Sequence, residues 1–564
     1  MDLFPAPELV FKRFAELAID RPRKRKLFLS LLNLLGINAY AEKTRRKMIA
    51  LAERGINPFD VDTVPTIFSG IYPEFSASIL FEKTNDPIAQ RATKLVLAAL
   101  EFRQSLLSDS LGKETSGETI SDNDRNHNFF GRVANVRKIG LKWNKDVKHC
   151  KNGAHIVVAV DGAFYKLNVI DGNGAVVAAG NILHDVTSII HAARSEPPTK
   201  PYGVITANLT GPSAEIFYAD KLDESIRTID EAIFLIAIDN GEAPADENEA
   251  GQHLHIRNHR NRDYRKSIQL VVMKNGFSGI TVNFFSGIEG MLAVKFASFI
   301  HSYAKNIPEI VATKNHDSVS TLEFETIDFS KLPLAELKGK IAKYSCNFPL
   351  IKTIDAVGKD GIKQLRVSPD AFFHAAAHLA YYDRFKKIPS MHNLIDMRGI
   401  KFGSISRYLS TTDELAQFLE NQTKPALLAA FDAHKRKIDV IRSGDNPMHY
   451  AYYYLFATVT AKSALGVAIF RLFVPDLFTK HVSPDIWASN IPALPGIYCV
   501  GRFGVFFKAA RKNCLAGHYL LFPDHIRVCF PSNEESFLKS WQFDQALKDA
   551  ILKLKRILSR EDLQ

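Results

Sequence analysis

The chain has 564 residues, of which 46% are hydrophobic and 24% charged, so it is a folded globular protein too long for one ordinary core. The net charge of +11 comes from 72 basic and 61 acidic residues spread along the chain, which a solvated surface with a mild basic bias explains. Five cysteines stand at Cys150, Cys346, Cys499, Cys514 and Cys529. Their odd number, wide spacing and lack of a CxxC motif argue against a disulfide framework or a zinc site and favour a reducing, cytoplasmic setting.

The first 100 or so residues have apolar positions at helical spacing, as in "ELVFKRFAELAI" and "IAQRATKLVLAALEFRQSLL". The apolar run "KLFLSLLNLLGI" is shorter than the about 20 residues that a membrane-spanning helix needs. The basic run "RPRKRK", Arg21 to Lys26, could be a nuclear address, a contact with a membrane surface or a solvated helix end.

Strand patterns follow. The segment "HIVVAVDGAFYKLNVIDGNG" has β-branched and aromatic runs broken by Asp-Gly and Asn-Gly, which predicts a hairpin. "ESIRTIDEAIFLIAIDN" begins as a helix and ends as a strand, and "SIQLVVMKNGFSGITVNFF" predicts a second hairpin that turns near Asn275 and Gly276. "GMLAVKFASFIHSYAK" then predicts a helix.

The second half repeats this mixture. "LEFETIDF" predicts a strand, and "SPDAFFHAAAHLAYYDRFKK" predicts a helix with Ser368 as N-cap and Pro369 in the first turn. "PALLAAFDAHKRKIDVIRS" and "EESFLKSWQFDQALKDAILKLKRILSRED" predict further helices. Strands alternating with helices favour an α/β fold of two mixed sheets covered by helices.

Common catalytic and ligand motifs are missing: there is no Gly-rich phosphate loop, GxSxG or HExxH. "HLHIRNHRNR", His253 to Arg262, has three histidines in seven residues, but the Arg and Asn residues between them supply no ligand set. We therefore predict a solvated polar loop there, no metal site and, without a fold-level motif for it, no nucleic-acid partner.

Five segments, in the expected order, resemble those of the choline/carnitine acyltransferase family. They are "HIVVAVDGAFYKLNVIDGNG", "PYGVITAN", "DESIRTIDEAIFLIAIDN", "NRDYRKSIQLVVMKNGFSG" and "GKDGIKQLRVSPDAFFHAAAHLAYY". The resemblance implies two back-to-back domains like chloramphenicol acetyltransferase, each a mixed sheet with helices, with a tunnel between them. It divides the chain into a helical segment over 1–84 packed on the C-terminal domain, a first acyltransferase-like domain over 85–325 and a second over 326–564 with the CoA-binding segment.

The resemblance also implies a CoA side. No cofactor is bound permanently, and a CoA thioester is the co-substrate. "GKDGIKQLRVSPDAF" keeps the two lysines of the family, Lys359 and Lys363, with Arg366 also basic. Neighbouring cations offset the charge of the phosphates of CoA. Asp370 matches the family aspartate near the CoA moiety, although a solvated basic loop before a capped helix would show the same pattern.

The catalytic side departs from the family pattern, which has a histidine base in "EHxxxEG" or "EHxxxDG". In "TVNFFSGIEG" the base position falls on Phe285, or on Phe284 when counted forward, and a phenyl ring accepts no proton. Loss of a positioned general base commonly costs about 10²–10⁴-fold in rate. Glu289, which matches the carboxylate that orients the histidine, is present without that partner. The Ser-Thr-Ser segment corresponds to Ala488–Asn490, where Ser489 or Asn490 could still donate to an oxyanion.

The acceptor side departs as well. The family holds the carboxylate of carnitine with a Tyr, a Thr and an Arg, and these positions fall on His392, Ile405 and Met448. An apolar Ile and Met cannot pair with a buried carboxylate, so carnitine is not the expected acceptor. His392 could be a substitute base or a packing histidine, and His449 is a weaker candidate of the same kind.

Two hypotheses follow from the sequence. The first is an acyltransferase that takes an acyl group from CoA, or from the phosphopantetheine of a carrier protein, to an unknown acceptor. The second is a catalytically inactive relative that binds a CoA thioester or a protein partner. The two lysines that match the CoA side and Glu289 favour the first. The simultaneous change at the base, at the Ser-Thr-Ser segment and at all three carboxylate-binding positions favours the second.

Overall fold

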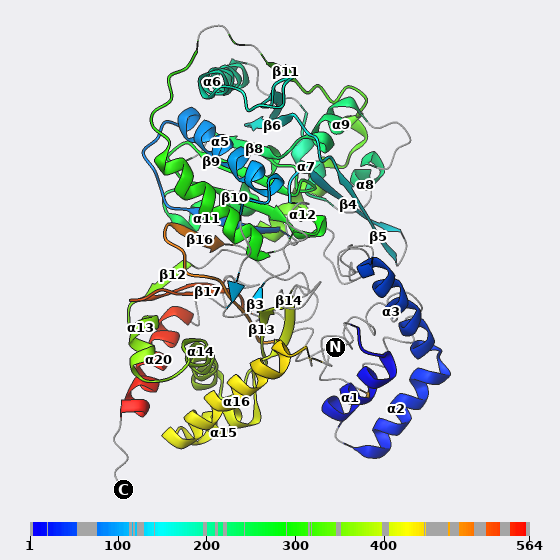
Figure 1. The fold of residues 1–564 in the computed structure, drawn as a ribbon, viewed down its shortest axis with the longest axis vertical. Helices are drawn as coiled ribbons and strands as arrows, with labels where there is room; N and C mark the ends of the chain where they lie inside the picture. Colours follow the sequence, from blue (N-terminus) through cyan, green and yellow to red (C-terminus); the bar gives the residue numbers. More distant parts are fainter. Residues whose placement is uncertain are drawn as a thin grey trace.

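The structure is a computed structural model, and Figure 1 shows two α/β bodies stacked along its long axis, with the N-terminal helices beside the lower one. The residues that it describes are 4–19, 21–53, 76–111, 115–116, 119–120, 129–139, 142–195, 200–208, 212–217, 223–241, 243–288, 290–313, 316, 318–345, 351–397, 405–444, 446, 472–473, 484–500, 515–530 and 542–559.

The upper body is built on a mixed sheet with the strand order β11-β7-β6-β8-β9-β10-β1-β16. These strands are β1 (Ser76–Phe81), β6 (His155–Val160), β7 (Ala163–Asn168), β8 (Leu235–Asp239), β9 (Ile268–Met273), β10 (Ser278–Asn283), β11 (Val319–Thr321) and β16 (Ile497–Val500). Strand β8 pairs in parallel with both β6 and β9, whereas the other neighbours pair antiparallel. The carboxyl ends of β6 and β8 therefore meet at one edge of the sheet.

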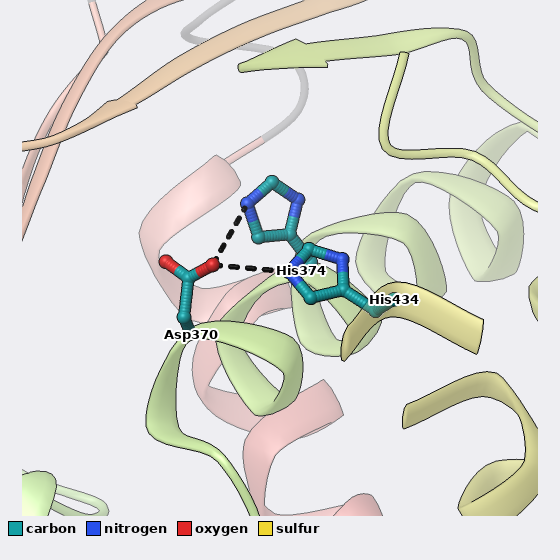
Figure 2. Close-up of side chains that lie close together, drawn as sticks. All are labelled: Asp370, His374 and His434. Atoms are coloured by element: carbon teal, nitrogen blue, oxygen red, sulfur yellow. Dashed lines mark hydrogen bonds and ion pairs between the residues drawn. The ribbon is translucent and has the colours of Figure 1, made fainter. Parts of the chain in front are cut away.

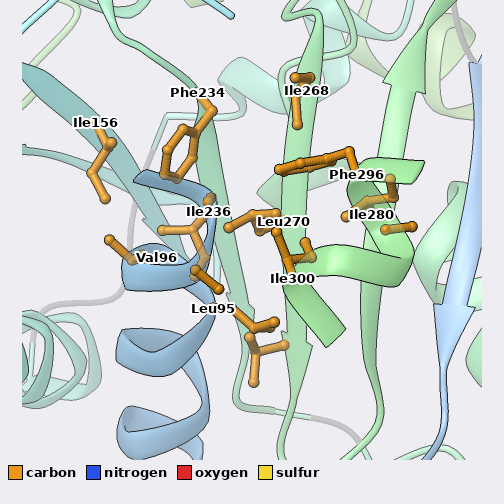
Figure 3. Packing of buried hydrophobic residues seen from close by; sticks show 14 of the residues in the cluster. Leu95, Val96, Ile156, Phe234, Ile236, Ile268, Leu270, Ile280, Phe296 and Ile300 are labelled. Atoms are coloured by element: carbon orange, nitrogen blue, oxygen red, sulfur yellow. The ribbon is translucent and has the colours of Figure 1, made fainter. Parts of the chain in front are cut away.

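Helices cover both faces of this sheet. One face packs against α5 (Ile88–Leu107), α6 (Ala179–Ser195) and α11 (Gly290–Asn306). Figure 3 shows Leu95 and Val96 of α5 and Phe296 of α11 against Ile236 and Leu270 of the strands. The opposite face packs against shorter elements, which are α7 (Tyr202–Thr206), α9 (Glu224–Glu231), α10 (Glu247–Gln252) and the π-helix η3 (His253–Arg257). Burial on both faces explains why these strands are near-continuous apolar runs.

The lower body has a second mixed sheet, with the order β12-β18-β17-β15-β13-β14. Its strands are β12 (Ile351–Ile354), β13 (Met391–Asp396), β14 (Ile405–Leu409), β15 (Ile486–Asn490), β17 (Leu515–Leu521) and β18 (Ile526–Cys529). Its helices are α13 (Lys359–Gln364), α14 (Pro369–Phe385), α15 (Asp413–Asn421), α16 (Lys424–Arg442) and α20 (Phe543–Ser559). Helix α14 lies between the sheet, α16 and α20, and its buried side chains form the centre of this core.

The remaining elements are peripheral. They are α1 (Pro7–Ala18), α2 (Pro22–Leu34), α3 (Ile37–Glu53), α8 (Pro212–Phe217), α12 (Leu334–Ser345), β2 (Thr115–Ser116), β3 (Thr119–Ile120), β4 (Arg132–Ile139), β5 (Lys142–His149) and the short 3₁₀ turns η4 (His259–Asn261), η5 (Phe284–Ser286) and η6 (Phe329–Lys331). The basic run 21–26 stands at the start of α2, where most of it is exposed. Among the described helices, none combines the length and the apolar character that crossing a bilayer requires.

The α/β class with two mixed sheets is confirmed, as are the two predicted hairpins, β6–β7 and β9–β10. The helix predicted after Ser368 is confirmed too, because the Ser368 hydroxyl accepts the N–H of Ala371 and Pro369 opens α14. The predicted domain boundaries stay predictions. Two strands from outside 85–325, β1 and β16, complete the first sheet.

Two local predictions were wrong. "LEFETIDF" is not a strand, because Phe324 has a left-handed φ of 50° and Asp223 accepts both the N–H and the hydroxyl of Thr326, which replaces pairing with a neighbouring strand. The segment 253–262 is not a solvated loop: it forms η3 and η4, and His253 and His255 are buried.

Candidate active site

The lower body holds a cavity of about 1030 Å³, here called the second-domain cavity. It is lined by α13, the start of α14, β13, β14, α16 and the end of β15, and by Met291 at the start of α11 in the upper body. The cavity therefore extends to the upper body at the point that follows β10 and η5.

A basic wall forms one side of this cavity. Lys359 and Lys363 lie four residues apart on the one face of α13, and Arg366 follows with a left-handed φ of 58°. The helix is fixed on the β17–β18 turn, since the N–H of Lys359 donates to the carbonyl of Phe522 over 2.7 Å. Within the described ranges none of these three cations has a carboxylate at ion-pair distance, so the wall is available to an anionic ligand.

Asp370 lies beside the wall, in the first turn of α14. Its carboxylate accepts hydrogen bonds from three other elements: from Asn490 at the end of β15 over 3.0 Å, from Tyr519 of β17 over 2.5 Å and from His434 of α16 over 3.0 Å. Figure 2 shows the rings of His374 and His434 beside each other, both facing the same oxygen of the Asp370 carboxylate. The Asp370 carboxylate thus links the start of α14 to β15, β17 and α16 at the cavity.

The charge state of Asp370 follows from these partners. Burial opposes ionisation of the Asp370 carboxyl, but the hydrogen bond from His434 and the nearby charges of His374 and His434 outweigh it, so its pKa lies well below the usual value. Because the carboxylate can only accept, Nε2 of His434 donates to it, and Nδ1 is the ring nitrogen that does not contact Asp370. His434 lines the cavity, so the Asp370–His434 pair has the arrangement of a base oriented by a carboxylate.

His374 is held in a different state. Its Nε2 accepts from the amide of Asn393 over 2.7 Å and lies 4.0 Å from Asp370, and burial lowers its pKa well below the usual value. The ligand atoms of Asp370, His374 and His434 lie within 4.8 Å of one another, a carboxylate and two imidazoles that could hold a divalent transition metal. The sequence predicted no metal site, and both carboxylate oxygens already accept hydrogen bonds, from Asn490, Tyr519 and His434.

The predicted site residues divide between the two faces of the second sheet. The amides of Asn393 and Asn490 bond to His374 and Asp370 of α14, so both side chains face that helix. Their neighbours along the strands, His392 and Ser489, therefore face the other side. His392 is 3% exposed there and stacks on Trp487 with 5.3 Å between ring centroids. Its role as a substitute base stays a prediction.

The Phe285 position lies in η5, between β10 and α11, and Met291 shortly after it lines the cavity. Glu289, Met448 and His449 lie outside the described residues.

Sequence reasoning missed His374, His434 and Tyr519. The spacing of Asp370, His374 and His378 at successive helical turns is visible in "SPDAFFHAAAHLAYY" and could have indicated one polar stripe on a buried helix. The approach of His434 and Tyr519 depends on the packing of α16 and β17 and leaves no local signal.

A pH dependence of stability is expected from His378. The ring is buried between the carbonyl of His374 and the hydroxyl of Thr411, and burial lowers its pKa from 6.5 to about 4. The unfolded chain therefore binds the proton more tightly, so stability is complete above pH 6.5 and falls as the pH drops towards 4, by up to about 3 kcal/mol for this group. Denaturant unfolding between pH 7 and 4 should show a shallower loss in His378→Gln than in the parent, and equal slopes would contradict the assignment.

Comparison with known proteins identifies the family. The choline/carnitine O-acyltransferase family model matches residues 67–549, so the chain belongs to that family and the resemblance seen in the sequence is confirmed. The carnitine O-acetyltransferase of Rattus norvegicus is 24% identical over 472 residues, which cover 78% of this chain and 70% of the relative. The choline O-acetyltransferase of Sus scrofa is 25% identical over 372 residues, which cover 61% of this chain and 57% of the relative.

Solved structures are more distant. The epimerization domain from the third module of tyrocidine synthetase B is 11% identical with a TM-score of 0.37, covering 86% of this chain and 93% of that domain. The trichothecene 15-O-acetyltransferase from Fusarium sporotrichioides is 9% identical with a TM-score of 0.36, covering 87% of this chain and 98% of that enzyme. Structural similarity with TM-scores this low supports no conclusion about function.

Proposed function

We propose that the protein is an acyl-CoA-dependent acyltransferase that delivers its acyl group to an acceptor other than carnitine. The observation that carries this proposal is the basic wall of the second-domain cavity. Lys359, Lys363 and Arg366 are exposed, lack carboxylate partners within the described ranges and line the same cavity as Asn490. Cations in this arrangement suit the 3′-phosphate and diphosphate of CoA, or the phosphate of a carrier-bound phosphopantetheine.

The proposal of an acceptor other than carnitine rests on the loss of groups that would bind its carboxylate. Ile405 and Met448 stand where the resemblance places two of the groups that hold the carboxylate of carnitine, and neither can pair with an anion. An amine acceptor is consistent with Phe285 at the base position, because a neutral amine attacks a thioester with less help from a base than a hydroxyl does.

A base for the reaction is nevertheless available in the cavity. His434 is the one histidine among the described residues that line it, and Asp370 orients its ring through Nε2. This supports His434 rather than His392, which faces the opposite side of the sheet, as the group that takes the proton of the acceptor.

The test is thiol release from acetyl-CoA and from a long-chain acyl-CoA in the presence of amines, alcohols, choline and carnitine. We expect acceptor-dependent release with a compound other than carnitine, and a loss in kcat of about 10²-fold or more in His434→Gln. The matched control is His392→Ala, which should keep most of the turnover. Loss of turnover in His392→Ala alone would instead support the base predicted from the sequence.

A second candidate is a non-catalytic relative that binds a CoA thioester or a protein partner, and Phe285 at the base position favours it. It predicts CoA binding without acceptor-dependent thiol release for any acceptor class. A protein that uses CoA suits the cytoplasmic setting expected from the cysteines. The exposed basic start of α2 would suit a contact with an anionic membrane surface.

A further inference from the structure

The upper body contains a separate cavity of about 820 Å³, here called the first-domain cavity. It lies where the carboxyl ends of the parallel strands β6 and β8 meet, and it is lined there by the Asp161–Gly162 turn and by Gly241. It shares no lining residue with the second-domain cavity. In open α/β sheets this edge of parallel strands is the usual place for a ligand.

The charge of this cavity is strongly one-sided. Five cationic side chains line it, and they are Arg194, Lys200, Arg257, Arg260 and Lys338. The single carboxylate in the lining, Asp161, turns to the backbone and accepts the N–H of Asn240 over 3.3 Å.

Within the described ranges, four of these five cations have no carboxylate at ion-pair distance. Arg257 is paired with Glu249 at 3.0 Å, and Arg194 donates to the neutral amide of Asn240. Lys200 donates to the backbone carbonyl of Glu323, and neither Arg260 nor Lys338 has a carboxylate at ion-pair distance within the described ranges. Both come close enough to His259 to lower its pKa, together with the larger effect of burial, so that ring is neutral and adds no charge. Like charges gathered in one concave site repel each other unless an anion binds between them.

The backbone segment that carries Arg257 and Arg260 is held in place by buried contacts. The segment 253–262 is tied to the end of β8 by a buried ion pair of 2.8 Å between Arg262 and Asp239. Asn261 adds a hydrogen bond of 2.8 Å to the same carboxylate and accepts the N–H of Gly162. A π-helix such as η3 is frequent at functional sites, and here it leads directly to Arg257.

A close approach of two backbone segments holds the same region in place. Helix α7 packs directly on η4 because Gly203 has no side chain: a Cβ there would lie 2.3 Å from the carbonyl oxygen of Arg260. Helix α12, which carries Lys338, packs against α7 and η3 from the other side. Packing therefore fixes the backbone that carries Arg260 and Lys338, whose side chains are exposed at the cavity.

We propose that the first-domain cavity binds the phosphate or diphosphate group of a small organic molecule, as a second anion site apart from the acyl-CoA site. Guanidinium groups match phosphate oxygens in pairs, and an ammonium supplies a point charge beside them. The apolar part of the lining, which includes Val204, Ile256 and Ile341, has room for the organic part of the ligand.

The experiment is calorimetric titration of the full chain with inorganic pyrophosphate and with adenosine 5′-diphosphate. To keep the acyl-CoA site out of the measurement, the parent for this titration carries Lys359→Glu and Lys363→Glu. We expect one site for each probe, weakened by about 10²-fold when Arg260→Gln and Lys338→Gln are added. Arg227→Gln with Lys331→Gln, two exposed cations outside both cavities, is the charge-matched control and should bind as the parent does.

Three results would overturn the inference. They are no binding to the parent at millimolar probe, unchanged binding in the Arg260→Gln, Lys338→Gln variant, and an equal loss in the charge-matched control. None of these bears on the acyl-CoA site, so failure here and failure of the proposed function remain distinguishable. Thermal unfolding of each variant shows that a loss of binding is not a loss of fold.

Discussion

Asp239→Ala is expected to lower the free energy of unfolding by about 3–5 kcal/mol, the range for removing one partner of a buried ion pair. Asp239 and Arg262 are 2% and 0% exposed, and the carboxylate accepts two bonds from the guanidinium and one from Asn261. The substitution leaves a buried guanidinium without its counter-charge. Urea unfolding of the parent and the variant measures the difference.

Two controls sharpen this result. Glu224→Ala breaks an exposed pair of similar length, 2.9 Å to Arg227, and should cost less than about 1 kcal/mol. Replacing both buried partners, Asp239→Leu with Arg262→Met, should recover much of the loss, because no uncompensated charge is left inside. If Asp239→Ala lowered the free energy of unfolding by less than about 1 kcal/mol, water would reach this pair. The ion pair would then not hold segment 253–262 rigidly at the first-domain cavity.

Charge reversal at Lys359 and Lys363 is expected to weaken CoA binding by about 100-fold or more, since two attractive charges become repulsive beside the phosphates. Both side chains are exposed on α13, so the fold should be unaffected. Lys331→Glu with Lys548→Glu changes the net charge equally on exposed helical positions outside the second-domain cavity, and should bind CoA as the parent does. Equal weakening in both double variants would assign the effect to overall charge.

Much of the local structure could be predicted because it depends on nearby residues. Asn275-Gly276 favours a tight hairpin turn, and Ser368 and Pro369 favour the start of α14, through their own backbone preferences. The polar segment 253–262 could not be predicted in the same way, because its burial depends on Asp239, which lies on β8.

In the candidate site, too, features set by neighbouring residues could be predicted and contacts between distant residues could not. The basic wall comes from one continuous stretch, so Lys359, Lys363 and Arg366 could be singled out by resemblance, and they line one cavity together with Asp370. The contacts of Asp370 with His434 and Tyr519 join residues 64 and 149 positions apart in the chain, which no spacing rule connects. The side of the sheet that His392 takes depends on strand alternation next to Asn393, whose amide faces α14, and the role of His392 as a base stays a prediction.

The central claim is that the second-domain cavity binds acyl-CoA. The most direct measurement is calorimetric titration of the unmodified protein with CoA and with a long-chain acyl-CoA. The account predicts one site with micromolar affinity that is lost in Lys359→Glu, Lys363→Glu. An absence of binding at millimolar CoA would contradict it, and a protein partner would then become the leading candidate for what this fold binds.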